Sequence, residues 1–165
     1  MATHYDQAVE VKKIADELIP KYHAHLLDFS VKMEYRFIDK IPKKGGKEVW
    51  GTCRKISSLP ASLAADNPDG DDFFVIVISK PVWDILPDDK KEALVDHELC
   101  HAVAEYNDDD EDPAVKLGIK PHDLEEFTCI VRRHGMWRED LKDFIESAKS
   151  NGAKVVEEDE DEESD

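Results

Sequence analysis

The chain has 165 residues, 41% of them hydrophobic and 37% charged, which suits one hydrophobic core and excludes a fibrous or membrane-embedded protein. Its formal net charge is −17, and eight of the nine residues from Glu157 to Asp165 are acidic. We therefore expect a single folded domain over residues 1–150, a disordered acidic tail over residues 151–165 and little affinity for the nucleic-acid backbone.

The N-terminus and the cysteines indicate where the protein works. The chain starts without the basic segment and apolar run of a signal peptide, and it contains no run of 18 consecutive apolar residues. The three cysteines, Cys53, Cys100 and Cys129, are an odd number without close pairing, as is usual in reducing compartments. These features predict a cytoplasmic protein that does not enter a membrane, and they leave its oligomeric state open.

The first half of the chain predicts a helical segment followed by three strands. Residues 6–27 carry apolar side chains at helical spacing and are interrupted by Pro20, which predicts a kinked helix or two short ones. Three segments have strand character: Val31–Phe37, Glu48–Ile56 and Phe73–Ser79. The basic, glycine-containing link at 43–47 is typical of a turn, so we expect the first two strands to form an antiparallel pair.

The second half predicts two helices separated by a loop. One helix is expected from about Asp89 to Tyr106, opened by a capping box of Asp89 and Glu92. Residues 107–120 are expected to form a polar loop, and a last helix is expected from about Asp123 to Lys149. The order of elements predicts an α+β fold with an N-terminal helix, a small, three-stranded, mainly antiparallel sheet and two later helices.

A metal-binding motif occupies residues 97–101, with the sequence His-Glu-Leu-Cys-His. His97 and His101 are four residues apart, so on a helix they project from one face and can bind the same ion. Glu98 lies beside them and can take a proton from water without being a ligand, as in zinc hydrolases. We therefore expect Zn²⁺ at His97 and His101, with Glu98 as the catalytic general base.

A catalytic zinc site needs a third protein ligand, and the segment Pro121–Phe127 offers candidates. We choose His122. Glu126 and Glu125 are the alternatives, although Asp123 and Glu126 also have the spacing of a helix capping box, which would give Glu126 a structural role.

The residues around the motif resemble a known family. The segments are Glu-Ala-Leu-Val-Asp-His-Glu-Leu-Cys-His-Ala, then Pro-His-Asp-Leu-Glu-Glu-Phe about twenty residues later, then Val-Arg-Arg-His-Gly-Met-Trp. Together they are similar to the putative phage metallopeptidase family and, more distantly, to SprT-like zinc metallopeptidases. In the latter, the third ligand is a histidine followed closely by glycine and an aromatic residue. His122 and Phe127 match that pattern here, with Asp123 in place of the glycine.

The resemblance implies a zincin-like fold, a protein or peptide substrate and, for a phage-encoded chain, the host cytoplasm. We expect a zinc metallopeptidase that hydrolyses peptide bonds. The alternative is a non-enzymatic interaction protein, in which the metal is structural and the acidic surface binds a host protein as a nucleic-acid mimic. We expect Cys100 to be a small buried thiol, and His23 lies outside any ligand spacing.

Overall fold

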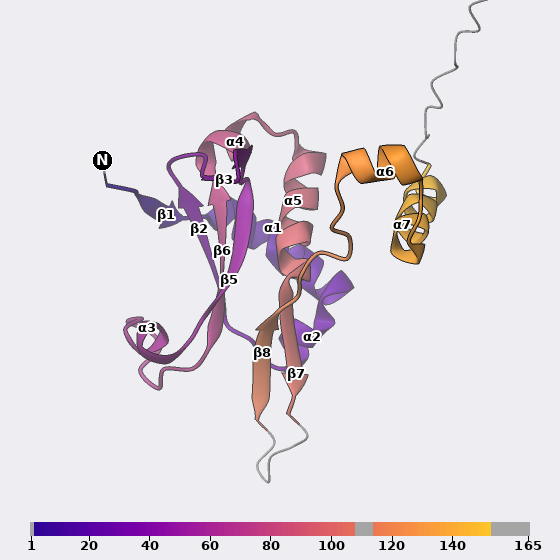
Figure 1. Cartoon of the computed structure of the whole chain (residues 1–165). Coiled ribbons are helices and arrows are strands. Elements are labelled where there is room, and N and C mark those ends of the chain that lie inside the picture. The colour runs from indigo at the N-terminus through magenta and orange to yellow at the C-terminus, as the bar shows by residue number, and fades with distance from the viewer. Residues whose placement is uncertain (1, 108–113, 153–165) are drawn as a thin grey trace, which may run out of the picture. The chain divides into compact units, whose positions relative to one another are not determined.

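The computed structural model describes residues 2–107 and 114–152, so the predicted acidic run Glu157–Asp165 lies outside the described residues. The chain divides into two compact units, Met1–Pro121 and His122–Asp165. The first unit holds a mixed sheet with helices packed on it, and the second holds two helices (Figure 1). The class is α+β, as predicted, while the single domain over residues 1–150 stays a prediction.

The main sheet has four strands in the order β1 (Tyr5–Gln7), β2 (Met33–Ile38), β6 (Phe73–Ser79) and β5 (Gly51–Ile56). Strand β2 pairs with β6 in parallel, whereas β1 pairs with β2 and β5 pairs with β6 in antiparallel fashion. The predicted antiparallel pair of the first two strands is therefore wrong, because β6 lies between them. Strand β6 is a continuous apolar run, and such a strand is most stable at the centre of a sheet.

The predicted turn between those strands does form, but it closes a separate small hairpin. Strands β3 (Lys43–Lys44) and β4 (Lys47–Glu48) pair with each other across two glycines. Gly45 and Gly46 have φ angles of 57° and 78°, which favour glycine. Because these four strand residues are exposed and charged, the hairpin has no apolar face with which to extend into β2 and β5.

One face of the sheet is covered by helices. Phe74, Ile76 and Ile78 alternate along β6, are fully buried and belong to the same core as helices α1 and α5. Helix α1 (Val9–Tyr22) and helix α2 (Ala24–Asp28) are separated at His23. Of the two predicted alternatives, a kinked helix or two helices, the second is therefore confirmed. Short helices α3 (Ser58–Ser62) and α4 (Lys80–Ile85) flank β6 along the chain.

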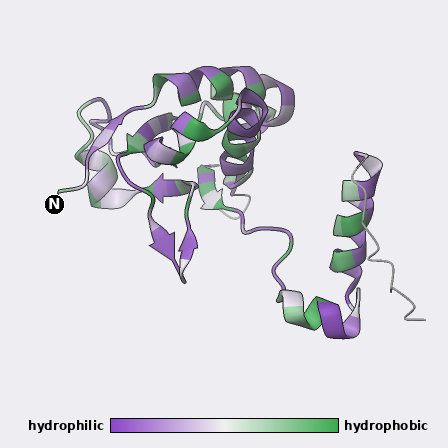
Figure 2. Cartoon of the chain, turned by 90° about the horizontal axis from the view of Figure 1, so that it is seen from above, coloured by the Kyte–Doolittle hydropathy of each residue, from purple (hydrophilic) through white to green (hydrophobic). Residues whose placement is uncertain are grey.

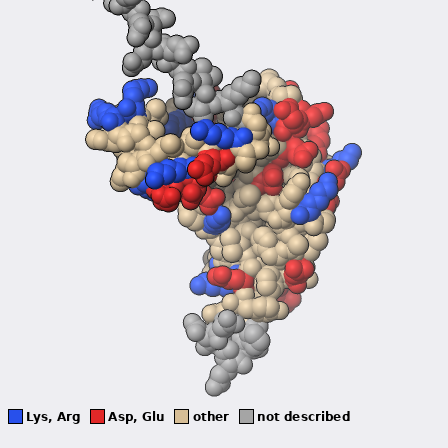
Figure 3. All heavy atoms as spheres, turned by 90° about the vertical axis from the view of Figure 1, so that its right-hand side faces the viewer, with Lys and Arg blue, Asp and Glu red and all other residues tan. Residues whose placement is uncertain are grey.

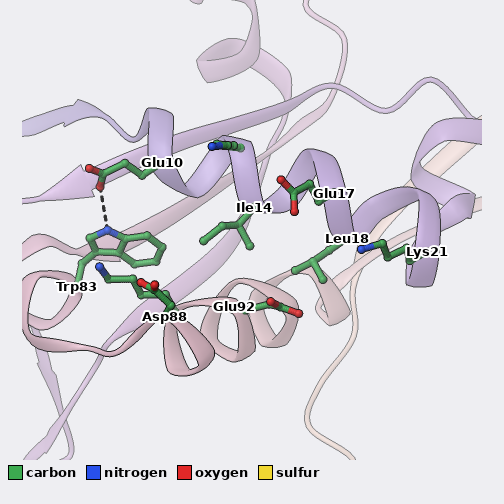
Figure 4. Close-up of a pocket in the computed structure, with 10 residues that line it drawn as sticks. Glu10, Ile14, Glu17, Leu18, Lys21, Trp83, Asp88 and Glu92 are labelled. Carbon is green, nitrogen blue, oxygen red and sulfur yellow. Dashed lines mark hydrogen bonds between the residues drawn. The ribbon is translucent and has the colours of Figure 1, made fainter.

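Helix α5 (Asp88–Cys100) carries the metal-binding motif and packs against α1. Figure 4 shows the seam between them, where the indole Nε1–H of Trp83 donates a hydrogen bond to Glu10 Oε2 at 2.9 Å. The ammonium of Lys91 lies 5.3 Å from the centre of the Trp83 ring. Pro87 is the N-cap and no side chain caps the helix, so the predicted capping box of Asp89 and Glu92 is wrong.

Helix α5 ends at Cys100 and not at Tyr106 as predicted. Residues Ala102–Tyr106 form strand β7, which pairs with β8 (Val115–Ile119) in an antiparallel hairpin. The predicted polar loop over residues 107–120 therefore contains a strand. Ala102 and Ala104 are buried and the residues between and after them are more exposed, so this short segment satisfies the two-residue period of a strand.

The second unit contains helices α6 (Thr128–His134) and α7 (Glu139–Ser150) in place of the single predicted helix. Gly135 is the C-cap of α6, and its φ of 63° and ψ of −151° are a combination that essentially only glycine adopts, so α6 ends there. Phe127 is the N-cap of α6, so the predicted capping role of Asp123 is wrong. Figure 2 shows hydrophobic residues on one side of α7 and hydrophilic residues on the other.

The surface mixes charges of both signs. On the face in Figure 3, acidic and basic side chains are interspersed with uncharged areas. Exposed ion pairs such as Lys12–Asp16 are of the kind that contributes less than about 1 kcal/mol to stability. In the described part of the chain, no helix combines the length and the apolar character needed to cross a membrane.

Candidate metal centre

His97 and His101 meet at the C-terminal end of helix α5. His97 lies in its last turn and His101 is its C-cap, with helical φ and ψ of −73° and −24°. The centres of the two imidazole rings are 5.2 Å apart, and the ring planes are inclined by 79°. The four-residue spacing thus brings both rings to one place even though the helix ends there.

The backbone of Lys120 holds His101 in place. The amide of Lys120 donates to the carbonyl oxygen of His101 at 2.8 Å, which continues the β7–β8 hairpin by one step. The Nδ1 of His101 lies 2.6 Å from the carbonyl oxygen of Lys120. Because a carbonyl can only accept, this contact places the proton on Nδ1, and a neutral imidazole then presents its lone pair at Nε2. Metal-binding histidines are commonly oriented by such a bond to a backbone carbonyl.

Glu98 is almost entirely buried, with 4% of its surface exposed. Burial raises the pKa of its carboxyl from 4.5 to about 7, and the nearby His101 opposes part of that rise. A carboxylate with a pKa near neutrality is well matched to accept a proton and return it at physiological pH.

Gly51 provides the space that Glu98 occupies. A Cβ atom built on Gly51 would lie 2.7 Å from Glu98 Oε1 and 2.9 Å from Ile78 Cδ1, which is closer than real Cβ contacts. The neighbouring Cys53 is also affected, because burial, with a further contribution from Glu98, raises the pKa of its thiol to about 12. Gly51 was not predicted from the sequence, because no motif marks it.

His97 and Glu98 open onto a surface pocket of about 450 Å³ between helix α5 and the start of strand β5. Strand β5 is at the edge of the four-stranded sheet. Trp50, with 45% of its surface exposed, is the largest side chain of the pocket. The lining residues are Glu48, Val49, Trp50, Gly51, Lys90, Ala93, Leu94, His97 and Glu98.

The predicted third ligands belong to the second unit. His122 is its first residue and is exposed, and it follows Lys120, the residue anchored to His101, by two positions. Glu125 is exposed. Glu126 is engaged within the second unit, where Oε1 accepts a hydrogen bond from the amide of Phe127 at 2.8 Å and Oε2 lies 3.9 Å from Arg138.

Comparison with known proteins identifies a family. The model of the family described as "putative phage metallopeptidase" matches residues 3–149, which is most of the chain. No curated protein and no solved structure matches the chain significantly. The chain belongs to the putative phage metallopeptidase family.

Proposed function

We propose that this protein is a zinc-dependent peptidase, in which His97 and His101 bind the ion and Glu98 is the general base. The observation that carries the proposal is the buried Glu98, with its raised pKa, between two histidines whose rings adjoin. The residues present suit zinc, since imidazole nitrogen is among its preferred ligands and His101 is already oriented by Lys120. A bound ion would supply Lewis-acid chemistry at the scissile carbonyl.

Glu98 performs the proton transfers in this proposal. Its carboxylate accepts a proton from the attacking water and then delivers that proton to the leaving amide nitrogen. Burial favours the protonated form of Glu98, so the raised pKa assists the first transfer, and a pKa near neutrality still allows the proton to be delivered to the leaving nitrogen. The absence of a side chain at Gly51 leaves the space in which the carboxylate can serve both steps.

His122 is the proposed third ligand. Two residues of chain span at most about 7 Å, so the Cα atom of His122 cannot lie farther than that from the Cα atom of Lys120. Lys120 is in turn hydrogen-bonded to His101 through its backbone. Glu126 is the next candidate, but its two contacts within the second unit would have to break first. Glu125 has no observation in its favour.

The substrate is proposed to be a protein or peptide that lies along the pocket beside strand β5. An edge strand offers backbone hydrogen-bonding groups to an extended peptide, and Trp50 offers an apolar surface to one of its side chains. This placement brings the backbone of the substrate next to His97 and Glu98, which line the same pocket.

Metal analysis and a protease assay test the two halves of the proposal separately. Purified protein should contain zinc, His97→Ala should contain one ion fewer per chain, and His134→Ala should match the wild type, because His134 lies at the end of helix α6, twelve positions after His122 in the chain. Glu98→Gln should keep the zinc and lose cleavage of a peptide library by at least a hundredfold, within the usual range for a general base. Wild-type protein without metal would refute the site, and bound zinc without cleavage that depends on Glu98 would indicate a structural metal.

A further inference from the structure

A second group of possible metal ligands lies beside the first on helix α5. It consists of His23, Asp96 and Cys100, whose ligand atoms all lie within 4.8 Å of one another. Asp96 and Cys100 are one helical turn apart near the end of the helix, and His23 comes from the junction of helices α1 and α2. Asp96 immediately precedes His97, and Cys100 immediately precedes His101. The two groups therefore occupy adjacent faces of the last turn of helix α5.

His23 is the buried member of the group. Only 5% of its surface is exposed, and its Nε2 lies 2.6 Å from Asp96 Oδ1. Its backbone is held on both sides, because its amide donates to Ile19 and its carbonyl oxygen accepts from the amide of Leu26. The imidazole is therefore positioned by the fold before any ligand binds, which lowers the cost of forming a site.

The chemistry of the group suits a divalent zinc-type ion. An imidazole nitrogen, a carboxylate oxygen and a thiolate sulfur are all ligands that zinc accepts, and the two anions balance its charge. The ion would take the place of the proton shared by His23 and Asp96, and the Cys100 thiol would release its proton to solvent on binding. Contrary to the expectation of a buried thiol, Cys100 is exposed, so an ion can enter from solvent.

We propose that His23, Asp96 and Cys100 form a second metal site, distinct from the one at His97 and His101. An ion bound there would join the end of helix α5 to the junction of helices α1 and α2. Since Asp96 and Cys100 adjoin His97 and His101 in sequence, this link would fix the rotation of the last helical turn and so position the motif histidines. The second site does not depend on peptidase activity.

Cobalt substitution tests the second site, because a thiolate bound to Co²⁺ gives a near-ultraviolet charge-transfer band that histidine and carboxylate ligands do not give. The full chain is titrated with Co²⁺ alone, as wild type and as Cys100→Ser, with Cys129→Ser as the matched control because Cys129 is also exposed and helical. The wild type and Cys129→Ser should show the band, and Cys100→Ser should lose it. The His97→Ala variant should keep the band, since it damages only the first site.

Zinc content gives the second measurement. The wild type should bind about two ions per chain, and Cys100→Ser and His97→Ala should each bind about one. His23→Gln should lose the same ion as Cys100→Ser, provided that its circular dichroism matches the wild type. A band that is absent from the wild type, or that survives in Cys100→Ser, overturns the second site. If His97→Ala loses one zinc ion and keeps the band, the result supports the second site and shows that the lost ion was bound at His97 and His101.

Discussion

The raised pKa of Glu98 predicts that the metal-free protein is less stable at neutral pH than at acidic pH, and that Glu98→Gln removes this difference. The substitution replaces a carboxyl with an amide of nearly the same shape, so packing is preserved while the ionisation is lost. Burial raises the pKa of Glu98 from 4.5 to about 7. At about 1.4 kcal/mol per pKa unit, that rise corresponds to roughly 3 kcal/mol between the protonated and ionised forms.

The sign of the effect follows from which state binds the proton more tightly. The folded state holds the proton of Glu98 more tightly than the unfolded state, so the stabilising contribution is complete below about pH 4.5. It is lost as the pH rises from there to about 7, where the folded state must also ionise the buried group. The prediction applies to protein stripped of metal, because a nearby cation would favour the carboxylate.

The assay is urea unfolding of chelated protein across a pH series from about 4.5 to 8, with wild type and Glu98→Gln compared at each pH. Other titrating groups contribute to both proteins and cancel in the difference. The free energy of unfolding of the variant should gain roughly 3 kcal/mol on the wild type over this series. Glu92→Gln, an exposed position on the same helix, is the control and should give a flat difference. Parallel profiles for wild type and Glu98→Gln would refute the reasoning, as would a difference of opposite sign.

Three further substitutions test the space beside Glu98, the hydrophobic core and the contact between Trp83 and Glu10. Gly51→Ala should displace the carboxylate of Glu98, lowering peptidase activity at least tenfold and stability by about 1–3 kcal/mol; unchanged kinetics would contradict the close approach. Leu99→Ala, at a fully buried position, should lower the free energy of unfolding by about 2–5 kcal/mol in urea titrations, and a loss below 1 kcal/mol would show that the core is not tightly packed there. Trp83→Phe removes the hydrogen bond to Glu10 and should cost about 1 kcal/mol in thermal unfolding, whereas an unchanged midpoint would indicate that the bond contributes nothing.

Helices and strands could be predicted from the sequence where the apolar residues follow one spacing clearly. Strand β6 was predicted with its observed bounds, because six consecutive apolar residues between turn signals leave little alternative. The beginning of helix α5 was predicted to within one residue. The end of that helix was not, since the apolar residues after His101 fit both a helical and a strand period. Pairing with β8 decides between the two, and that pairing is a tertiary contact.

In the candidate site, too, residues in a local motif were predictable and residues brought together by the fold were not. His97, Glu98 and His101 form a contiguous motif and could be found by spacing alone. The space for Glu98 depends on Gly51, which lies 47 positions earlier, and the partner of Asp96 is His23, which lies 73 positions earlier. Neither pairing leaves a local pattern, because each is created by the order of strands and by helix packing.

His101 is held by two contacts with the main chain of Lys120, one through its amide and one through its carbonyl oxygen. Any residue with a backbone N–H can supply both contacts, whereas proline cannot supply the amide donor. These two contacts therefore depend on the backbone conformation at this position and not on the identity of the side chain. A comparison of sequences would consequently overlook one of the contacts on which the proposed metal centre depends.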